Sequence, residues 1–251
     1  MLNIVMPIAG RGHRFREAGY TVPKPLIPVH GRPMVEMVVE NIRPSRPHRF
    51  IFLALREHLD QFRIDEVLQR AAPDCIILPV SQVTEGATCT VLLARDYLQS
   101  SDPLMIANGD QWVGVDIDRY LDALAELDGL IMTMRADHPK WSYAAVDESG
   151  RVVKVAEKQP ISNEATVGIY SFARGRDFVR GAEQMMAKNL RVNNEFYVCP
   201  VYNELIGWGA KVGVYNVGWV GVGMSGLGTP EDLELFLKRP GKPGMKTLVS
   251  P

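Results

Sequence analysis

The amino-acid sequence predicts an α/β fold in which helices cover the faces of a mostly parallel mixed sheet. Up to about residue 135, short apolar segments alternate with amphipathic segments of helical periodicity, as expected of strand–helix units. The apolar segments are continuous, which is typical of strands buried on both faces of a parallel sheet. The 251 residues are enough to bury a substantial core.

The first half of the chain supplies the parallel part of the expected sheet. Strands are predicted at residues 2–8, 49–55, 75–80, 103–107 and 130–134. Helices are predicted at residues 34–42, 58–70, 86–98 and 117–127, where apolar side chains recur at helical spacing. Pro33 suits the first turn of the 34–42 helix, because proline lacks the N–H that a first turn leaves unpaired.

The pattern changes after about residue 135, where the turn sequence Asp147-Glu148-Ser149-Gly150 predicts a hairpin. Its strands are expected at 143–146 and 152–156, followed by strands at 165–172 and 211–217 and helices at 176–187 and 196–206. Thr229 and Pro230 fit the N-cap and first position of a last helix that runs to about residue 238. We expect one domain over residues 1–239 and a loose tail over residues 240–251.

Composition argues against several functional classes. The net charge is -1, so no basic field favours nucleic acid and no polybasic segment favours a membrane surface. The N-terminus lacks the pattern of a signal peptide, and no apolar run has the length of a membrane span. Three widely spaced cysteines match no zinc or redox motif. These features predict a cytoplasmic protein with reduced thiols, and a symmetric dimer is the generic expectation for its assembly.

The N-terminal loop carries the pattern of a phosphate-binding site. The first strand runs into Gly10-Arg11-Gly12-His13-Arg14, and Lys24 follows between Pro23 and Pro25. Glycines let backbone N–H groups approach a phosphate closely, and arginine and lysine neutralise its charge. Ligands of open α/β sheets bind at the carboxyl ends of the strands, where this loop is expected.

Asn108-Gly109-Asp110 follows the expected strand at 103–107 and has two interpretations. Taken alone, the three residues are typical of a type I′ turn. At the carboxyl end of a strand on the edge that holds the phosphate loop, Asp110 is instead a candidate ligand for Mg²⁺. This cation needs few protein carboxylates, because phosphates and water fill its other positions.

Together these segments resemble the signature of the sugar-1-phosphate nucleotidyltransferases (sugar-nucleotide pyrophosphorylases), A-G-G-x-G-x-R followed by P-K-P. The matching segments are residues 9–15 and 23–26, with one glycine fewer. Glu157-Lys158-Gln159-Pro160 resembles the family's E-K-P, 167–170 its G-[I/L]-Y strand, and 194–197 another sugar-side segment. The resemblance implies a Rossmann-like, GT-A-like domain without a C-terminal β-helix. Its nucleotide-binding part would span about residues 1–135 and its acceptor-binding part about 136–239.

The resemblance also implies a role for each matching residue. Catalysis would fall to Arg14 and Lys24, and Asp110 would hold Mg²⁺. Nucleotide binding would involve Ala9, Gly10, Arg11, Gly12, Gln82, Gly86 and Asn108, and acceptor binding Glu157, Lys158, Gly168 and Glu195. Trp141 and Tyr143 are further candidates for the acceptor pocket or for the core. One departure stands out: Gly226 occupies the position of the family's second metal-binding aspartate in a W-x-D-x-G-T segment.

The resemblance implies a transferase that joins the nucleoside monophosphate of a nucleoside triphosphate to a phosphomonoester, most simply a sugar 1-phosphate, and releases pyrophosphate. Such an enzyme would serve the synthesis of surface polysaccharide or glycans. Three alternatives stay open: a CTP-dependent cytidylyltransferase for a non-sugar phosphate, a GT-A-type glycosyltransferase and a non-catalytic nucleotide-binding regulator. The N-G-D sequence lacks the D-x-D of the glycosyltransferases, and Gly226 in place of aspartate is the feature that keeps the regulator open.

Overall fold

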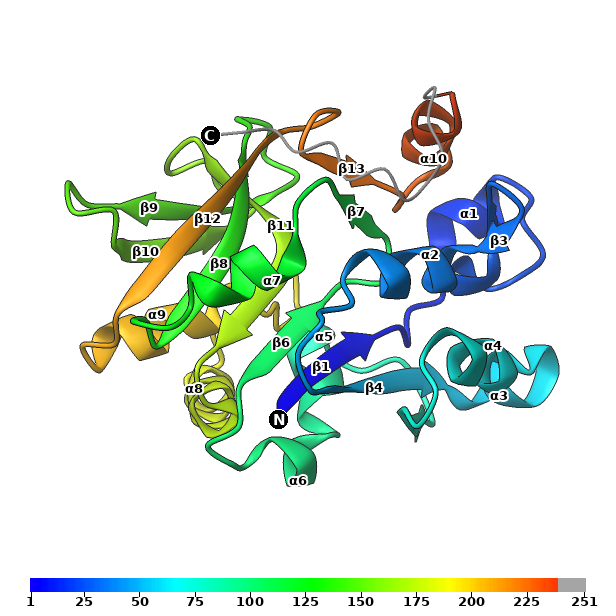
Figure 1. Cartoon of the computed structure of the whole chain (residues 1–251), viewed down its shortest axis with the longest axis horizontal. Coiled ribbons are helices and arrows are strands. Elements are labelled where there is room, and N and C mark those ends of the chain that lie inside the picture. The colour runs from blue at the N-terminus through cyan, green and yellow to red at the C-terminus, as the bar shows by residue number, and fades with distance from the viewer. Residues whose placement is uncertain (239–251) are drawn as a thin grey trace.

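A mixed sheet of nine strands lies at the centre of residues 1–238, the part of the chain that the computed structural model describes (Figure 1). Its path is β10-β9-β11-β6-β1-β4-β5, and β8, which pairs with β11, also pairs with β12. The strands are β1 (Leu2–Pro7), β4 (His48–Leu55), β5 (Ile76–Val80), β6 (Leu104–Ala107), β8 (Gly129–Arg135), β9 (Ser142–Val146), β10 (Val152–Glu157), β11 (Glu164–Phe172) and β12 (Val212–Trp219). The pairings among β6, β1, β4 and β5 are parallel, whereas β11 is antiparallel to β6, β8 and β9. The predicted α/β fold with a mixed sheet is confirmed.

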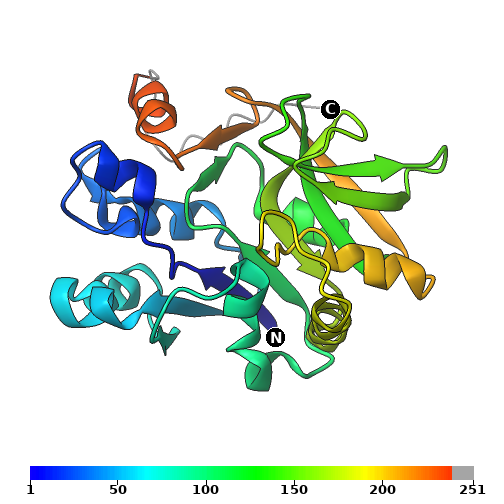
Figure 2. The same ribbon diagram turned by 180° about the vertical axis from the view of Figure 1, so that it is seen from behind.

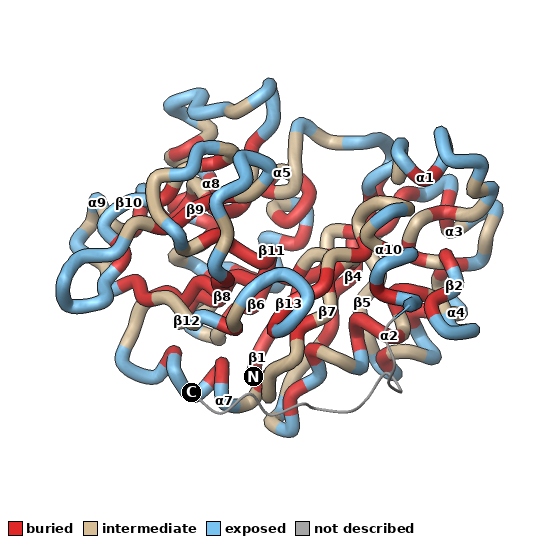
Figure 3. The backbone as a smooth tube through the Cα atoms, turned by 90° about the horizontal axis from the view of Figure 1, so that it is seen from above, coloured by how far each residue is buried: buried red, intermediate tan, exposed pale blue. Residues whose placement is uncertain are grey.

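Helices cover both faces of this sheet. Alternate residues of β1 enter different cores: Ile4 and Met6 join one apolar cluster and Val5 joins the other. The first cluster takes most of its helical residues from α2 (Met34–Asn41), α4 (Ile64–Ala71) and α7 (Ile117–Asp122). The second takes them from α5 (Ala87–Leu92), α6 (Arg95–Leu98), α8 (Gly175–Ala187) and α9 (Val201–Gly207). Figure 2 shows α5 and α8 on the face opposite to α7, and Figure 3 shows buried residues concentrated along the strands.

Four predicted helices are shorter or interrupted in the structure, and of the segment 117–127 only Ile117–Asp122 (α7) is helical. The segment 58–70 forms α3 (Arg56–Phe62) and α4, separated by Arg63 in the left-handed conformation with φ 49°. The segment 86–98 forms two helices, α5 and α6. Between them the N–H groups of Leu93 and Ala94 donate hydrogen bonds to carbonyl groups only three residues earlier, which is the tighter 3₁₀ pattern and interrupts the α-helix. The segment 196–206 is helical only from Val201, after Pro200.

Smaller elements gather at the carboxyl ends of the parallel strands. They are α1 (His13–Glu17), the 3₁₀ helix η1 (Lys24–Leu26), β2 (Pro28–Val29), β3 (Arg32–Pro33), β7 (Gln111–Val113), β13 (Met224–Gly226) and α10 (Pro230–Leu237). β7 pairs with β13, and neither Asn108 nor Gly109 has the positive φ that a type I′ turn requires. The type I′ interpretation is therefore wrong. Asn108-Gly109-Asp110 connects the central sheet to a small ribbon that stands beside α10.

The N-cap prediction for the last helix is confirmed, since the Thr229 hydroxyl accepts a hydrogen bond of 3.1 Å from the Asp232 N–H. The predicted tail at 240–251 lies outside the described residues. None of the helices within residues 1–238 has the length and apolar character needed to cross a bilayer.

Candidate active site

The glycine loop after β1 folds against the lysine turn. Gly12 has φ 61°, a left-handed conformation that favours glycine, and it forms the N-cap of α1. A Cβ on Gly12 would lie 3.1 Å from Lys24 Cβ, so a side chain there would crowd the lysine. Phe15 is buried and packs edge-on against Tyr20 at a centroid distance of 5.1 Å. These contacts hold α1 and η1 side by side, and with them Arg14 and Lys24.

Lys24 and Asp110 form an ion pair across two loops. Lys24 Nζ donates to Asp110 Oδ2 at 2.8 Å, and the two side chains are 26% and 19% exposed. Asp110 is itself anchored, because its carbonyl accepts a 2.7 Å hydrogen bond from the Leu227 N–H beside β13. The structure therefore brings the proposed catalytic lysine and the proposed metal ligand into direct contact although they are far apart in the sequence.

A cavity of about 380 Å³ opens at this pair. The loop after β6, the segment before β9, β13 and the start of α10 all contribute to its wall. Its lining consists of Arg14, Asp110, Gln111, Lys140, Trp141, Gly226, Gly228, Thr229, Glu231 and Asp232. Two cationic side chains therefore face the same space as three carboxylates, which is an arrangement suited to a phosphate-containing ligand accompanied by a divalent cation.

Asp232 lies next to the position where the family pattern expects an aspartate. A Cβ built on Gly226 would be 3.4 Å from Asp232 Oδ2, and one built on Gly228 would be 2.8 Å from Asp110 Oδ2. The two glycines thus leave room for two carboxylates at one wall of the cavity. Within residues 1–238 no group of three or more His, Cys, Asp or Glu side chains is placed to hold a metal by itself. A pair of carboxylates nevertheless fits Mg²⁺, because phosphate oxygens and water complete its coordination.

A second cluster lies on the antiparallel side of the sheet, at the end of β10. Lys158 Nζ donates to the Tyr197 hydroxyl at 2.7 Å and lies over the tyrosine ring at 4.8 Å from its centroid. Glu157 is buried and accepts a hydrogen bond from Ser142 Oγ. Glu195 is close enough to the others to affect the pKa values of Tyr197 and Glu157. Three separate segments therefore converge here, namely residues 157–158, residue 142 and residues 195–197.

Gly168 of β11 packs against the loop after β6. It has φ 79°, and a Cβ there would lie 2.4 Å from both Asn108 Nδ2 and Gln111 Oε1. The Asn108 N–H donates to the Gly168 carbonyl at 3.0 Å, and the pairing of β11 with β8 is interrupted here, between Thr166 and Tyr170. Gln111 is 9% exposed and its Oε1 has no hydrogen-bond partner within residues 1–238. The buried Oε1 of Gln111, a residue that lines the cavity, is thus available beside the bend at Gly168 to accept a hydrogen bond from a ligand.

The loop before α5 closes against the segment that precedes α9. The Phe196 N–H donates to the Glu85 carbonyl at 2.8 Å and the Thr88 N–H donates to the Phe196 carbonyl at 3.1 Å. Arg191 pairs with Glu85 at 2.7 Å and stacks over the Phe196 ring. The segment predicted to bind the nucleotide base is therefore fastened to the segment predicted to bind the acceptor.

Comparison with known proteins agrees with this geometry. The family model described as "Nucleotidyl transferase" matches residues 3–191, which include the glycine loop, the lysine turn, Asp110 and the Glu157-Lys158 pair. The chain belongs to the nucleotidyl transferase family. Membership in this family confirms the resemblance drawn from the sequence.

Relatives of this nucleotidyltransferase-family chain are distant. It is 23% identical over 176 residues to the bifunctional protein GlmU of Methanocaldococcus jannaschii, a match that covers 68% of this chain and 40% of the relative. It is 27% identical over 228 residues to GlmU of Aromatoleum aromaticum, which covers 84% of this chain and 46% of the relative. The chain thus spans less than half the length of these relatives.

A solved structure shares the fold over nearly the whole chain. The nucleoside-diphosphate-sugar pyrophosphorylase from Vibrio cholerae RC9 superposes with a TM-score of 0.80 at 24% identity, covering 95% of this chain and 100% of that one. The fold of that solved chain therefore extends over nearly all of this chain.

The nucleotidyltransferase-family fold brings three predicted site residues together at the cavity, groups three others at the end of β10, and leaves Arg11 and Gln82 outside both groups. Arg14, Lys24 and Asp110 meet at the cavity, whereas Arg11 points to the other side of the loop, towards Glu57. Gln82 is exposed. Trp141 lines the cavity, while Tyr143 is fully buried in the core, so only the first of these two aromatic residues fits an acceptor pocket.

Sequence reasoning missed four polar or charged side chains that line the cavity: Gln111, Lys140, Glu231 and Asp232. Gln111 directly follows Asp110, so its position after the strand could have indicated that it belongs to the site. Asp232 lies in the first turn of the last helix, where an acidic side chain is favourable for helix stability alone. Its proximity to Gly226 depends on the turn between β13 and α10, which no local pattern reveals.

Gly86 should not tolerate any side chain. Its φ of 125° is a conformation that residues with a Cβ rarely adopt, and a Cβ would lie 2.5 Å from the Phe196 carbonyl oxygen. We expect Gly86→Ala to lower the free energy of unfolding by about 3 kcal/mol, because strain and collision with a backbone atom add. Gly207, whose Cβ position is open, is the matched control. Chemical denaturation of both variants tests this, and equal stabilities would contradict it.

Glu157 should make stability depend on pH. Burial raises the pKa of this carboxyl above its usual value, against the opposing hydrogen bond from Ser142. The folded state therefore favours protonated Glu157. The stability that this preference contributes is lost as the pH rises from the pKa of Glu157 in the unfolded chain through its higher pKa in the folded protein. Glu157→Gln, which retains an acceptor for Ser142, should gain thermal stability over the wild type near about pH 8 but not near about pH 4. Melting curves at both pH values test this, with exposed Glu148→Gln as control; a pH-independent difference would contradict it.

Proposed function

We propose that this chain transfers the nucleoside monophosphate of a nucleoside triphosphate to a phosphomonoester, most simply a sugar 1-phosphate, and releases pyrophosphate. The observation that carries the proposal is the 2.8 Å contact of Lys24 with Asp110, which lines the same cavity as Arg14. The family match and the Glu157-Lys158-Tyr197 cluster at the neighbouring end of β10 support it.

The proposed reaction requires little acid–base chemistry from the protein. A phosphate oxygen of the acceptor forms a bond to the α-phosphorus of the triphosphate. The bond from that phosphorus to the oxygen bridging to the β-phosphate breaks, and pyrophosphate leaves with the electron pair. Because a phosphomonoester is already an anionic nucleophile, the protein's contribution is positioning and neutralisation of charge.

Each residue has a role in this proposal. The backbone of Ala9 to Gly12 would lie along the nucleotide, and Arg14 would neutralise charge on the departing pyrophosphate. Lys24 would contact the α-phosphate or the acceptor phosphate. Glu157 and Lys158 would bind the hydroxyls and the phosphate of the acceptor. The remaining nucleotide contacts would come from Gln82, Gly86 and Asn108, and those to the acceptor from Gly168 and Glu195.

Asp110 and Asp232 are the proposed holders of Mg²⁺. Asp232 makes no ion pair or side-chain hydrogen bond within residues 1–238 that would occupy its carboxylate, and its Oδ2 lies 3.4 Å from the position that a Cβ on Gly226 would take. Asp232 would thus take the place of the missing family aspartate. Bound Mg²⁺ would supply neutralisation of the phosphates. Supply of activated sugars for surface polysaccharide, a cytoplasmic location and a homodimeric state belong to the same proposal.

A pyrophosphate-release assay with the four nucleoside triphosphates and a panel of phosphomonoesters tests the proposal. The panel should contain hexose 1-phosphates, heptose 1-phosphates and phosphocholine, so that the acceptor class is read out together with the base. Release of pyrophosphate that requires both substrates is the expected result. Release restricted to CTP and a non-sugar phosphate would identify a cytidylyltransferase. Turnover of a nucleotide sugar without pyrophosphate, or binding without turnover, would overturn the proposal in favour of a glycosyltransferase or a regulator.

A further inference from the structure

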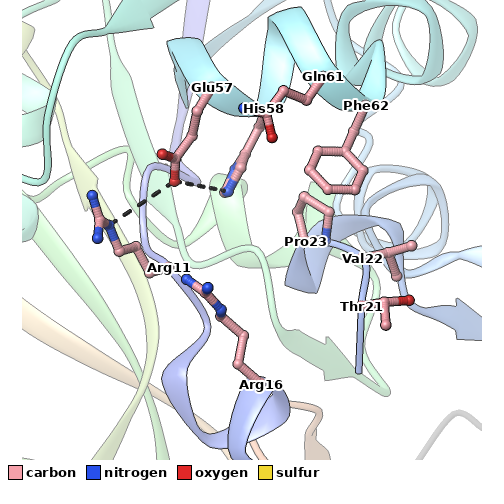
Figure 4. A pocket seen from close by; sticks show the side chains of 9 residues that line it. All are labelled: Arg11, Arg16, Thr21, Val22, Pro23, Glu57, His58, Gln61 and Phe62. Carbon is pink, nitrogen blue, oxygen red and sulfur yellow. Dashed lines mark ion pairs between the residues drawn. The ribbon is translucent and has the colours of Figure 1, made fainter. Parts of the chain in front are cut away.

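A second cavity, of about 250 Å³, lies on the other side of the glycine loop. Figure 4 shows Arg11 from the loop and Arg16 from α1 on one wall, with Glu57 and His58 from α3 opposite them. Phe62 and the Thr21–Pro23 segment close the far end. None of these side chains lines the cavity at Lys24 and Asp110.

His58 is the most unusual residue of this second cavity. It is 5% exposed, its Nδ1 has no hydrogen-bond partner within residues 1–238, and its Nε2 is 3.8 Å from Glu57 Oε1, too far for a hydrogen bond. Burial and the nearby Arg11 and Arg16 lower the pKa of His58, opposed by Glu57. A buried ring nitrogen such as Nδ1 that has no partner costs stability unless a ligand satisfies it.

The charges around His58 are poorly balanced. Arg11 Nε is 3.9 Å from Glu57 Oε1, which is an ion pair without a hydrogen bond, and Glu57 is 43% exposed. The guanidinium of Arg16 makes no ion pair or hydrogen bond within the described part of the chain, although Figure 4 shows it directed at the space between Arg11 and His58. One loosely held carboxylate thus faces two guanidinium groups and an imidazole.

The position of Arg16 follows from helix geometry. Residues two apart on a helix point about 200° apart around its axis. Arg14 therefore lines the cavity at Asp110 while Arg16 lines the cavity at His58. The short helix α1 carries one arginine into each cavity, so an anion held by Arg16 would act on the same helix that positions Arg14.

We propose that the cavity formed by Arg11, Arg16 and His58 is a binding site for a phosphate-class oxyanion. The anion accepts hydrogen bonds from both guanidinium groups and from the imidazolium that forms when His58 takes up a proton. Glu57, half-exposed and held only at 3.8 and 3.9 Å, turns outward to solvent as the anion enters. The cavity is the size of a small inorganic or organic phosphate rather than of a nucleotide.

Titration with inorganic phosphate at constant ionic strength tests this site, with the His58 ring signals followed by NMR and assigned with His58→Asn. We expect the ring to shift towards its protonated form in the wild type. Arg16→Gln should weaken phosphate binding about tenfold or more, and Glu57→Gln should strengthen it, because the competing carboxylate is gone. Arg56→Gln, on the same helix but outside the cavity lining, should bind as the wild type does. An unchanged His58 signal, or equal affinity in Arg16→Gln, would overturn the proposal.

The phosphate can come from two sources, and a second titration distinguishes them. This titration rests on the proposed function, since it is made in the presence of a saturating nucleoside triphosphate without acceptor. Undiminished phosphate binding identifies a site for a free anion beside the nucleotide. Loss of phosphate binding, with the His58 shift reproduced by the triphosphate alone, identifies a site for its terminal phosphates. If no nucleotide binds at all, the proposed function fails while the first titration still decides the anion site.

Discussion

Replacing Lys24 with methionine is expected to lower turnover by about two to three orders of magnitude while leaving the fold intact. Lys24 Nζ is the cation in contact with Asp110, and it stands at the cavity where the reacting phosphates are proposed to meet. Methionine keeps an unbranched stem beside Gly12 but removes the charge. Because the ion pair is partly exposed, its loss should cost little stability, about 1 kcal/mol or less.

The measurement is kcat for pyrophosphate release together with a thermal unfolding curve. Lys154→Met, on an exposed position of β10, is the matched control and should retain full activity. Arg14→Ala should reduce turnover to a comparable extent, since Arg14 lines the same cavity. Normal rates in both the Lys24 and the Arg14 variants would show that charge at this cavity does not contribute to the reaction.

The strands and the order of the site segments could be predicted because their signals are local. A continuous apolar run such as that of β4, six of whose residues are buried, has no other stable place than the centre of a sheet. Thr229 and Pro230 indicated their helix start because a cap depends on residues within one turn. The glycine loop, the lysine turn and Asp110 were recognisable for the same reason: each follows an element whose end the sequence marks.

Helix interruptions and side-chain directions could not be predicted, because they depend on contacts between distant residues. Nothing near Arg63 marks the left-handed residue that divides α3 from α4, since the apolar periodicity continues across it. Arg11 and Arg14 belong to one motif, yet their side chains lie on opposite sides of the loop: Arg11 faces Glu57, and Arg14 lines the cavity at Asp110. The proximity of Asp232 to Gly226 arises only when α10 folds back onto β13.

Asp110→Asn is expected to abolish the Mg²⁺ dependence of nucleotide binding and to reduce turnover by at least about a hundredfold. The amide keeps the size of the side chain but removes the charge that both Lys24 and a metal require. Asp232→Asn should raise the Mg²⁺ concentration needed for half-maximal nucleotide binding by about tenfold, a smaller effect, because Asp110, the carboxylate that also contacts Lys24, remains. Glu231 lines the same cavity, so Glu231→Gln is the control variant.

Moving the carboxylate back to residue 226 separates a metal-binding role of Asp232 from a structural one. A Cβ on Gly226 would be 3.4 Å from Asp232 Oδ2, an ordinary contact that Gly226→Asp can make without strain, since its φ is not in the left-handed region. In the Asp232→Asn background, Gly226→Asp should therefore restore Mg²⁺-dependent nucleotide binding, measured by calorimetry at several metal concentrations. If Asp232 only caps α10 or shapes the wall, the second substitution will restore nothing, because a carboxylate on β13 cannot replace a helix contact.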